Sequence, residues 1–123
     1  MITPVCNGLR VVFWGALVSI TILALLPNEA VVLPVTLWDK LTHSVAFCVL
    51  FVLAVLAWPK RPLWLPLLVL LAYGVGLELV QGLVGYRCAS LQDVVADSIG
   101  LLAGLSLLTL ARKGLRLHLR AST

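Results

Sequence analysis

Three pairs of polar residues stand at helical spacings in an otherwise apolar sequence. The pairs are Asp39 with His43, Glu78 with Gln81, and Asp93 with Asp97. Residues three or four apart lie on one face of a helix. A carboxylate beside an imidazole can act in general acid–base catalysis, and the same two groups can bind a divalent cation. The spacing therefore predicts a polar site, provided that each segment is helical.

The residue types suggest separate roles in such a site. Glu78 or His43 could be a general base, and Asp39 is a third candidate for the chemistry. Lys40 and Arg87 could hold a phosphate or carboxylate group. The other candidate binding residues are Gln81, Asp93 and Asp97. The sequence contains no Gly-x-Ser-x-Gly, Cys-x-x-Cys or His-Glu-x-x-His motif, so it leaves open whether the protein is an enzyme, and it identifies no cofactor beyond the divalent cation that these ligand types would fit.

The composition indicates that lipid surrounds the elements carrying these residues. Of 123 residues, 62% are hydrophobic and only 11% are charged, whereas a soluble domain has about a quarter charged residues. A globular protein of this size cannot bury so much apolar surface. An ordinary soluble fold, a disordered chain and a nucleic-acid-binding module are therefore excluded. Three cysteines, an odd number, imply no disulfide framework.

Four apolar stretches have about the length that a membrane-spanning helix needs. Prolines fall in the connections between them, where helices are expected to stop. We therefore predict an all-α fold in a single domain, an integral membrane bundle of four antiparallel helices with short loops. The predicted spans are 9–26, 41–58, 63–84 and 91–111, followed by a basic tail at 112–123.

The distribution of positive charge predicts the orientation of the bundle. Seven of the nine lysines and arginines lie at the start of the first span, separate the second from the third, or follow the fourth. Positive residues favour the cytoplasmic side, so both termini are expected to be cytoplasmic. The tail either enforces this topology, the interpretation we favour, or lies on anionic headgroups as a short amphipathic segment.

With this topology, three helix ends bring their polar residues to one level at the outer face. We expect a single polar pocket there, with the four acids Asp39, Glu78, Asp93 and Asp97 against Lys40 and Arg87. Four negative and two positive charges give the pocket a net charge of −2 when His43 is neutral. An unpaired charge in lipid costs several kcal/mol, which favours this shared pocket over lipid-facing positions.

Each residue also has a structural explanation. Asp39 and Asp93 could be helix N-caps, and Lys40 could extend its ammonium group to the interface. His43 could be a satisfied histidine of the bundle interior. Glu78 is the hardest to explain in this way, because it lies deepest and caps nothing. Because acids within membrane spans are usually functional, Glu78 is the strongest candidate.

Small residues repeat every four positions in the fourth span, at Ala96, Gly100 and Gly104. Such a stripe permits close approach of a second helix. We favour packing within one chain, and a homo-oligomer interface is the alternative.

Taken together, the polar and small residues resemble the VanZ family of small bacterial membrane proteins. The resemblance covers residues 39–104. One position differs, because the family usually has Asn where this chain has Asp97. The three matching blocks are Asp39-Lys40-x-x-His43-x-x-x-Phe47, Gly76-x-Glu78-x-x-Gln81, and Arg87-x-x-Ser90-x-x-Asp93-x-x-Ala96-Asp97-x-x-Gly100-x-x-x-Gly104.

The resemblance implies a role in the bacterial cell envelope, since the founding member is associated with resistance to the lipoglycopeptide teicoplanin. We expect a multi-pass protein of the cytoplasmic (inner) membrane that binds or acts on an amphiphile. The partner would be a lipid, a lipid-linked precursor or a lipoglycopeptide antibiotic, and not a nucleic acid. The alternative is a non-catalytic structural or partner subunit whose charges form a helix-packing network.

Overall fold

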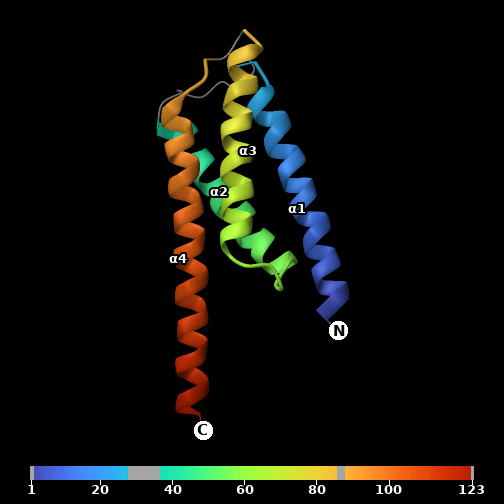
Figure 1. Ribbon diagram of the computed structural model, residues 1–123, viewed down its shortest axis with the longest axis vertical. Coiled ribbons are helices and arrows are strands. Elements are labelled where there is room, and N and C mark those ends of the chain that lie inside the picture. The colour runs from blue at the N-terminus through green and yellow to red at the C-terminus, as the bar shows by residue number, and fades with distance from the viewer. Residues whose placement is uncertain (1, 28–36, 86–87, 123) are drawn as a thin grey trace.

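The computed structural model describes residues 2–27, 37–85 and 88–122, and these form four helices and no strand. Consecutive helices run antiparallel (Figure 1). All four are long and apolar enough to cross a membrane, as the sequence predicted. They are α1 (Ile2–Leu25), α2 (Leu37–Ala57), α3 (Trp64–Leu83) and α4 (Leu91–Ala121).

Helix α2 is central to the packing. It contacts each of the other three helices, and its contact with α4 is the most extensive of any pair, whereas α1 and α3 touch little. In Figure 1, α1 leans away from α3 toward the N-terminus. The buried core is built around Phe47, Leu50 and Phe51 of α2, with Leu70 of α3 and Leu101 of α4 against them.

The close contact between α2 and α4 depends on the small residues of α4. A Cβ atom at Gly100 would lie 2.1 Å from the backbone oxygen of Ser44, and one at Gly104 would lie 3.0 Å from the ring of Phe51. The stripe of small residues therefore packs against α2 of the same chain. Assembly of several copies is a separate question and stays a prediction.

Three helices are longer than the sequence suggested, and one of them, α2, begins at Leu37 instead of residue 41. Helix α1 begins at Ile2 instead of residue 9, because Pro4 falls in its first turn, where proline is tolerated. Helix α4 continues through the basic tail to Ala121, since Leu, Arg and Lys favour helix. The tail is exposed on all sides. Leu117 lies about 200° around the helix from Leu115, so the tail has no single apolar face.

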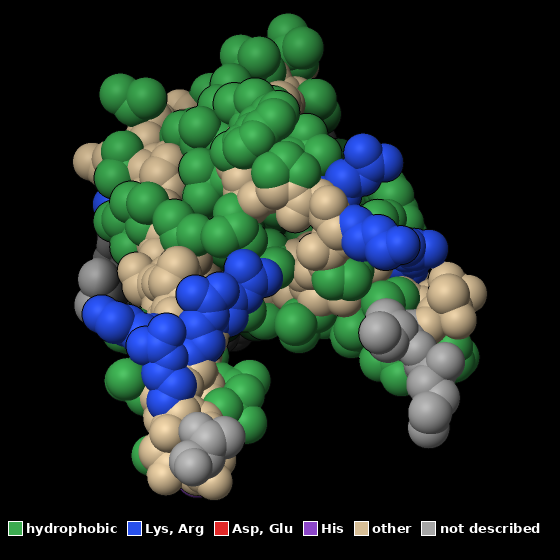
Figure 2. Space-filling model, turned by 60° about the horizontal axis from the view of Figure 1, so that its bottom comes forward, with side chains coloured by type: hydrophobic (Ala, Val, Ile, Leu, Met, Phe, Trp, Pro, Cys, Tyr) green, Lys and Arg blue, Asp and Glu red, His purple; other side chains and the backbone are tan. Residues whose placement is uncertain are grey.

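The two ends of the bundle carry different charges. The N-terminus, the C-terminal part of α4 and the connection between α2 and α3 lie at the same end (Figure 1). Figure 2 shows lysine and arginine side chains gathered there, with no acidic side chain visible among the described residues of that face. We call this the basic end. Its assignment to the cytoplasm stays a prediction.

Candidate functional site

The opposite end of the bundle brings the polar residues of three helices together. Helix α2 begins there, α3 ends there and α4 begins there. Among the described residues, all the buried charged side chains belong to this end. We call the group the polar cluster. It consists of Asp39, Lys40 and His43 of α2, Glu78 and Gln81 of α3, and Asp93 and Asp97 of α4.

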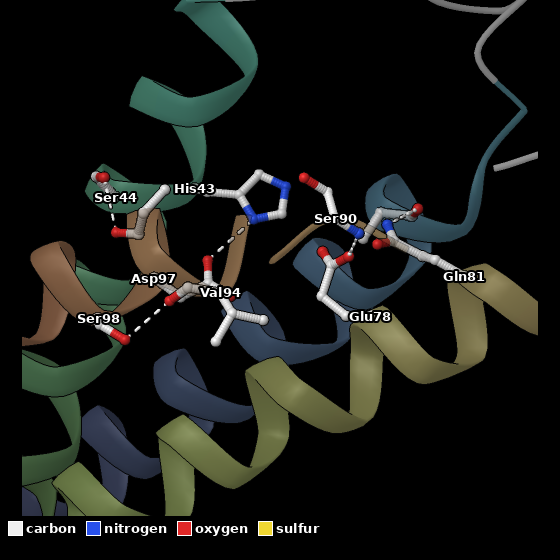
Figure 3. A network of polar contacts seen from close by, with 10 residues as sticks. His43, Ser44, Glu78, Gln81, Ser90, Val94, Asp97 and Ser98 are labelled. Carbon is white, nitrogen blue, oxygen red and sulfur yellow. Dashed lines mark hydrogen bonds and ion pairs between the residues drawn. The ribbon is translucent and has the colours of Figure 1, made fainter. Parts of the chain in front are cut away.

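The centre of the polar cluster is a contact between His43 and Asp97. The imidazole Nδ1 lies 2.9 Å from the Asp97 Oδ1 atom, and the Asp97 side chain is only 1% exposed. The second carboxylate oxygen, Oδ2, has no hydrogen-bond partner among the described residues. Figure 3 shows His43 reaching across from α2 to this carboxylate.

Space for Asp97 is provided by a glycine of α3. A Cβ atom at Gly74 would lie 2.8 Å from the Asp97 Oδ2 atom and 3.2 Å from the ring of Phe47. Any larger residue would therefore displace the carboxylate or the ring. This role of Gly74 cannot be read from the sequence, because it depends on which residue of α4 faces the glycine.

Glu78 is buried, with 4% of its surface exposed, and it has a role that sequence reasoning missed. Its Oε2 atom accepts a hydrogen bond of 2.7 Å from the backbone N–H of Ser90, the N-cap residue of α4. Glu78 thus helps to hold the start of a helix other than its own, contrary to the expectation that it caps nothing. Its Oε1 atom has no partner among the described residues.

Gln81 and Ser44 connect helices within the cluster. The Gln81 side-chain amide donates a 2.7 Å hydrogen bond to the carbonyl of Ala24, in the last turn of α1, where carbonyls lack intrahelical partners. The Ser44 hydroxyl donates to the carbonyl of Ala96 at 2.8 Å. Gln81, predicted as a binding residue, therefore has a structural contact, and Ser44 is an addition to the predicted set.

The outer part of the cluster lies nearer the surface. Asp39, His43 and Asp93 each offer a ligand atom, and these atoms lie within 4.8 Å of one another. Asp39 is in the first turn of α2, inside the helix and not before it. Lys40 donates a hydrogen bond from Nζ to the side-chain oxygen of Gln92, which the sequence analysis did not consider. Arg87 lies outside the described residues.

An open groove of about 580 Å³ runs between α2 and α4 beside the cluster. Lys40, Ser44 and Gln92 give it polar groups, and the rest of its wall is almost entirely apolar. The apolar lining residues are Leu41, Leu91, Val95, Ala96 and Ile99. A groove of this kind can accept a molecule that has both a polar and an apolar part.

Comparison with known proteins identifies the family. A model of the VanZ/LLP1 family matches residues 11–112, most of the chain and more than the stretch that carried the resemblance. Neither the comparison with curated proteins nor that with solved structures gave a significant match. With four helices able to span a membrane, the chain is a multi-pass membrane protein, and it belongs to the VanZ/LLP1 family.

Proposed function

We propose that this protein binds an amphiphilic molecule of the bacterial cell envelope at the outer face of the cytoplasmic membrane. The headgroup lies at the polar cluster, and the apolar tail follows the groove between α2 and α4. The molecule is a lipid, a lipid-linked precursor or a lipoglycopeptide. This class is proposed from the chemistry of the groove and from membership of the family.

The observation that carries the proposal is the composition of the groove. Lys40 and Gln92 lie on its wall together with Val95 and Ile99. The Val95 and Ile99 side chains are 52% and 57% exposed, so in a membrane they would face lipid. An amphiphile could therefore reach the groove sideways from the bilayer, without having its tail leave an apolar environment.

The buried acids add support. Charged groups inside membrane spans are costly and are usually retained for function. Glu78 and Asp97 each keep a buried carboxylate oxygen without a partner among the described residues. A network built only to hold helices together is expected to satisfy both oxygens. If the bound molecule reacts, His43 is the best-placed base, since the contact with Asp97 uses Nδ1 and leaves Nε2 for a ligand.

Comparative mass spectrometry of envelope lipids and lipid-linked precursors tests the proposal. Cells would express the wild type, Lys40→Ala, Glu78→Gln, or Lys113→Ala as a control at the basic end, at matched membrane levels. The purified proteins would be analysed for co-purifying amphiphiles in parallel. We expect a species that accompanies or changes with the wild type and Lys113→Ala, and that is reduced in the other two variants. Identical profiles for all proteins, with no co-purifying amphiphile, would contradict the proposal.

The second candidate is a structural or partner subunit, and specific contacts favour it. Glu78 holds Ser90, and Gln81 holds the end of α1, so the cluster does join helices. The phenotype of Glu78→Gln separates the two candidates, and thermal unfolding shows whether the variant is as stable as the wild type. A structural role predicts that Glu78→Gln, which keeps an oxygen for the Ser90 N–H, retains both stability and phenotype. A binding role predicts retained stability and a lost phenotype.

A further inference from the structure

We infer that the outer part of the polar cluster is a binding site for a divalent metal cation, with Asp39, His43 and Asp93 as its ligands. These residues come from two helices, and their ligand atoms lie within 4.8 Å of one another. Protein ligands bind zinc at about 2.0–2.2 Å, so small side-chain rotations would bring all three onto one ion. All three residues are half-buried, which leaves the ion accessible from outside.

The orientation of His43 supports this site. Asp97 holds the Nδ1 atom at 2.9 Å, and Asp97 is itself fixed by burial at 1% exposure. A histidine that binds a metal through one ring nitrogen almost always donates the other N–H to a carboxylate or carbonyl. The contact with Asp97 is that arrangement, and it directs Nε2 away from Asp97 for use as a ligand. Asp97 is therefore a positioning residue and not a ligand.

A second, independent observation is the carboxylate of Glu78. This side chain is 4% exposed, and its Oε1 atom has no partner among the described residues. In Figure 3 the carboxylate points from α3 toward Ser90, on the side of α3 where His43 also lies. Glu78 thus supplies a buried carboxylate oxygen without a described partner at the same end of the bundle as the three ligands.

The net charge of the cluster also favours a bound cation. The cluster contains the four acids Asp39, Glu78, Asp93 and Asp97 together with Lys40, and the sequence adds Arg87 between α3 and α4. The formal charges of these six residues sum to −2 when His43 is neutral. Excess negative charge at the edge of a low-dielectric region is costly. A divalent cation neutralises it, and its remaining coordination positions are available to water or to an oxygen of a second ligand.

The ligand types indicate which ions fit. Imidazole suits zinc and other transition metals, whereas carboxylate oxygens suit manganese and magnesium as well. One imidazole with two carboxylates therefore favours Zn²⁺ or Mn²⁺ over Ca²⁺, which takes six to eight oxygen ligands. Metal binding requires no amphiphile, so this inference and the proposed function can fail separately.

The test is metal binding by the purified full-length chain in detergent, freed of its affinity tag and stripped with a chelator. ZnCl₂ and MnCl₂ are titrated by calorimetry, and the retained metal is measured by mass spectrometry after desalting. We expect a single site per chain in the wild type and its loss in His43→Gln and Asp93→Asn. His118→Gln, which removes the histidine of the α4 tail, is the matched control and should bind like the wild type.

Asp97→Asn tests the positioning role. Loss of a carboxylate that orients a ligand typically weakens metal affinity about 10- to 100-fold, and we expect a loss of that size together with an altered visible spectrum of the Co²⁺-substituted protein. Because variants at this end could fail to fold, the wild type is also melted with and without each metal. Neither metal raising its melting temperature, or His43→Gln binding as tightly as the wild type, would overturn the inference.

Discussion

The two ends of the bundle use charged residues in opposite ways. At the basic end, the lysines and arginines are exposed or half-buried. Arg10, the most enclosed of them, lies 5.5 Å over the ring of Trp58 and donates a hydrogen bond to the carbonyl of Ala57. At the polar end, Glu78 and Asp97 are almost completely buried. Charges at the first end remain solvated, whereas those at the second must find partners within the protein.

The grooves at the two ends differ in the same way. A groove of about 410 Å³ at the basic end is lined by Trp14, Trp58 and other apolar residues, with Arg61 as its charged member. None of the buried acids of the described residues adjoins it. The groove at the polar end lies beside the polar cluster. Similar cavities in one bundle therefore have different expected ligands, because only one of them adjoins buried acidic groups.

The largest difference expected between the two ends is the side of the membrane that each one faces. Alkaline phosphatase fused after residue 35 or 88, between α1 and α2 or between α3 and α4, should be active, because positive residues favour the cytoplasmic side and most of them lie at the opposite end. Fusions after residue 60 or 123 should be inactive. Phosphatase activity in cells is the measurement. Inactive fusions at both 35 and 88 would reverse the orientation and place the polar cluster on the cytoplasmic side.

Glycines at the two ends should differ sharply in their tolerance of alanine. Gly100→Ala would place a Cβ atom 2.1 Å from the Ser44 carbonyl oxygen, and we expect a loss of about 3 kcal/mol or more, at the upper end of overpacking effects. Gly114→Ala meets nothing within 4 Å and should stabilise α4 by up to about 1 kcal/mol. Unfolding in detergent micelles measures both. Equal effects would show that α2 and α4 are not in close contact.

The contact between His43 and Asp97 should be sensitive to how its acceptor is removed. Asp97→Ala leaves a buried imidazole nitrogen without a partner, at a cost of about 1–3 kcal/mol. Asp97→Asn keeps an acceptor oxygen and should cost about 1 kcal/mol or less. Denaturant unfolding of the two variants checks the difference. If alanine and asparagine are equally tolerated, Nδ1 is not held by this carboxylate.

The smallest effect is expected for single charges of the α4 tail. Arg116 is exposed, and Arg116→Ala should change the free energy of unfolding by no more than about 0.5 kcal/mol. Thermal unfolding of the purified variant tests this. A loss comparable to that of Asp97→Ala would mean that the tail packs against something, and it would remove the distinction between the two ends.

Much of the fold was determined by the sequence alone. Apolar stretches of membrane-spanning length predicted four helices, and their spacing put Asp39 with His43, and Asp93 with Asp97, on common helix faces. The order of these residues also predicted the family. These features depend on local periodicity and composition, so they need no knowledge of how the helices pack. The helix ends were less certain, because α1 and α4 extend into segments that hydrophobicity alone does not mark.

Only the tertiary structure decided which residues meet. Asp97 contacts His43, Glu78 holds Ser90, and Gln81 reaches the end of α1. These partners depend on the rotation and axial position of each helix relative to its neighbours. In this chain the contact of Gly100 with Ser44 fixes those quantities for α2 and α4, since backbones this close leave little freedom to slide. Helical spacing determines which face a residue occupies, and helix packing determines what that face meets.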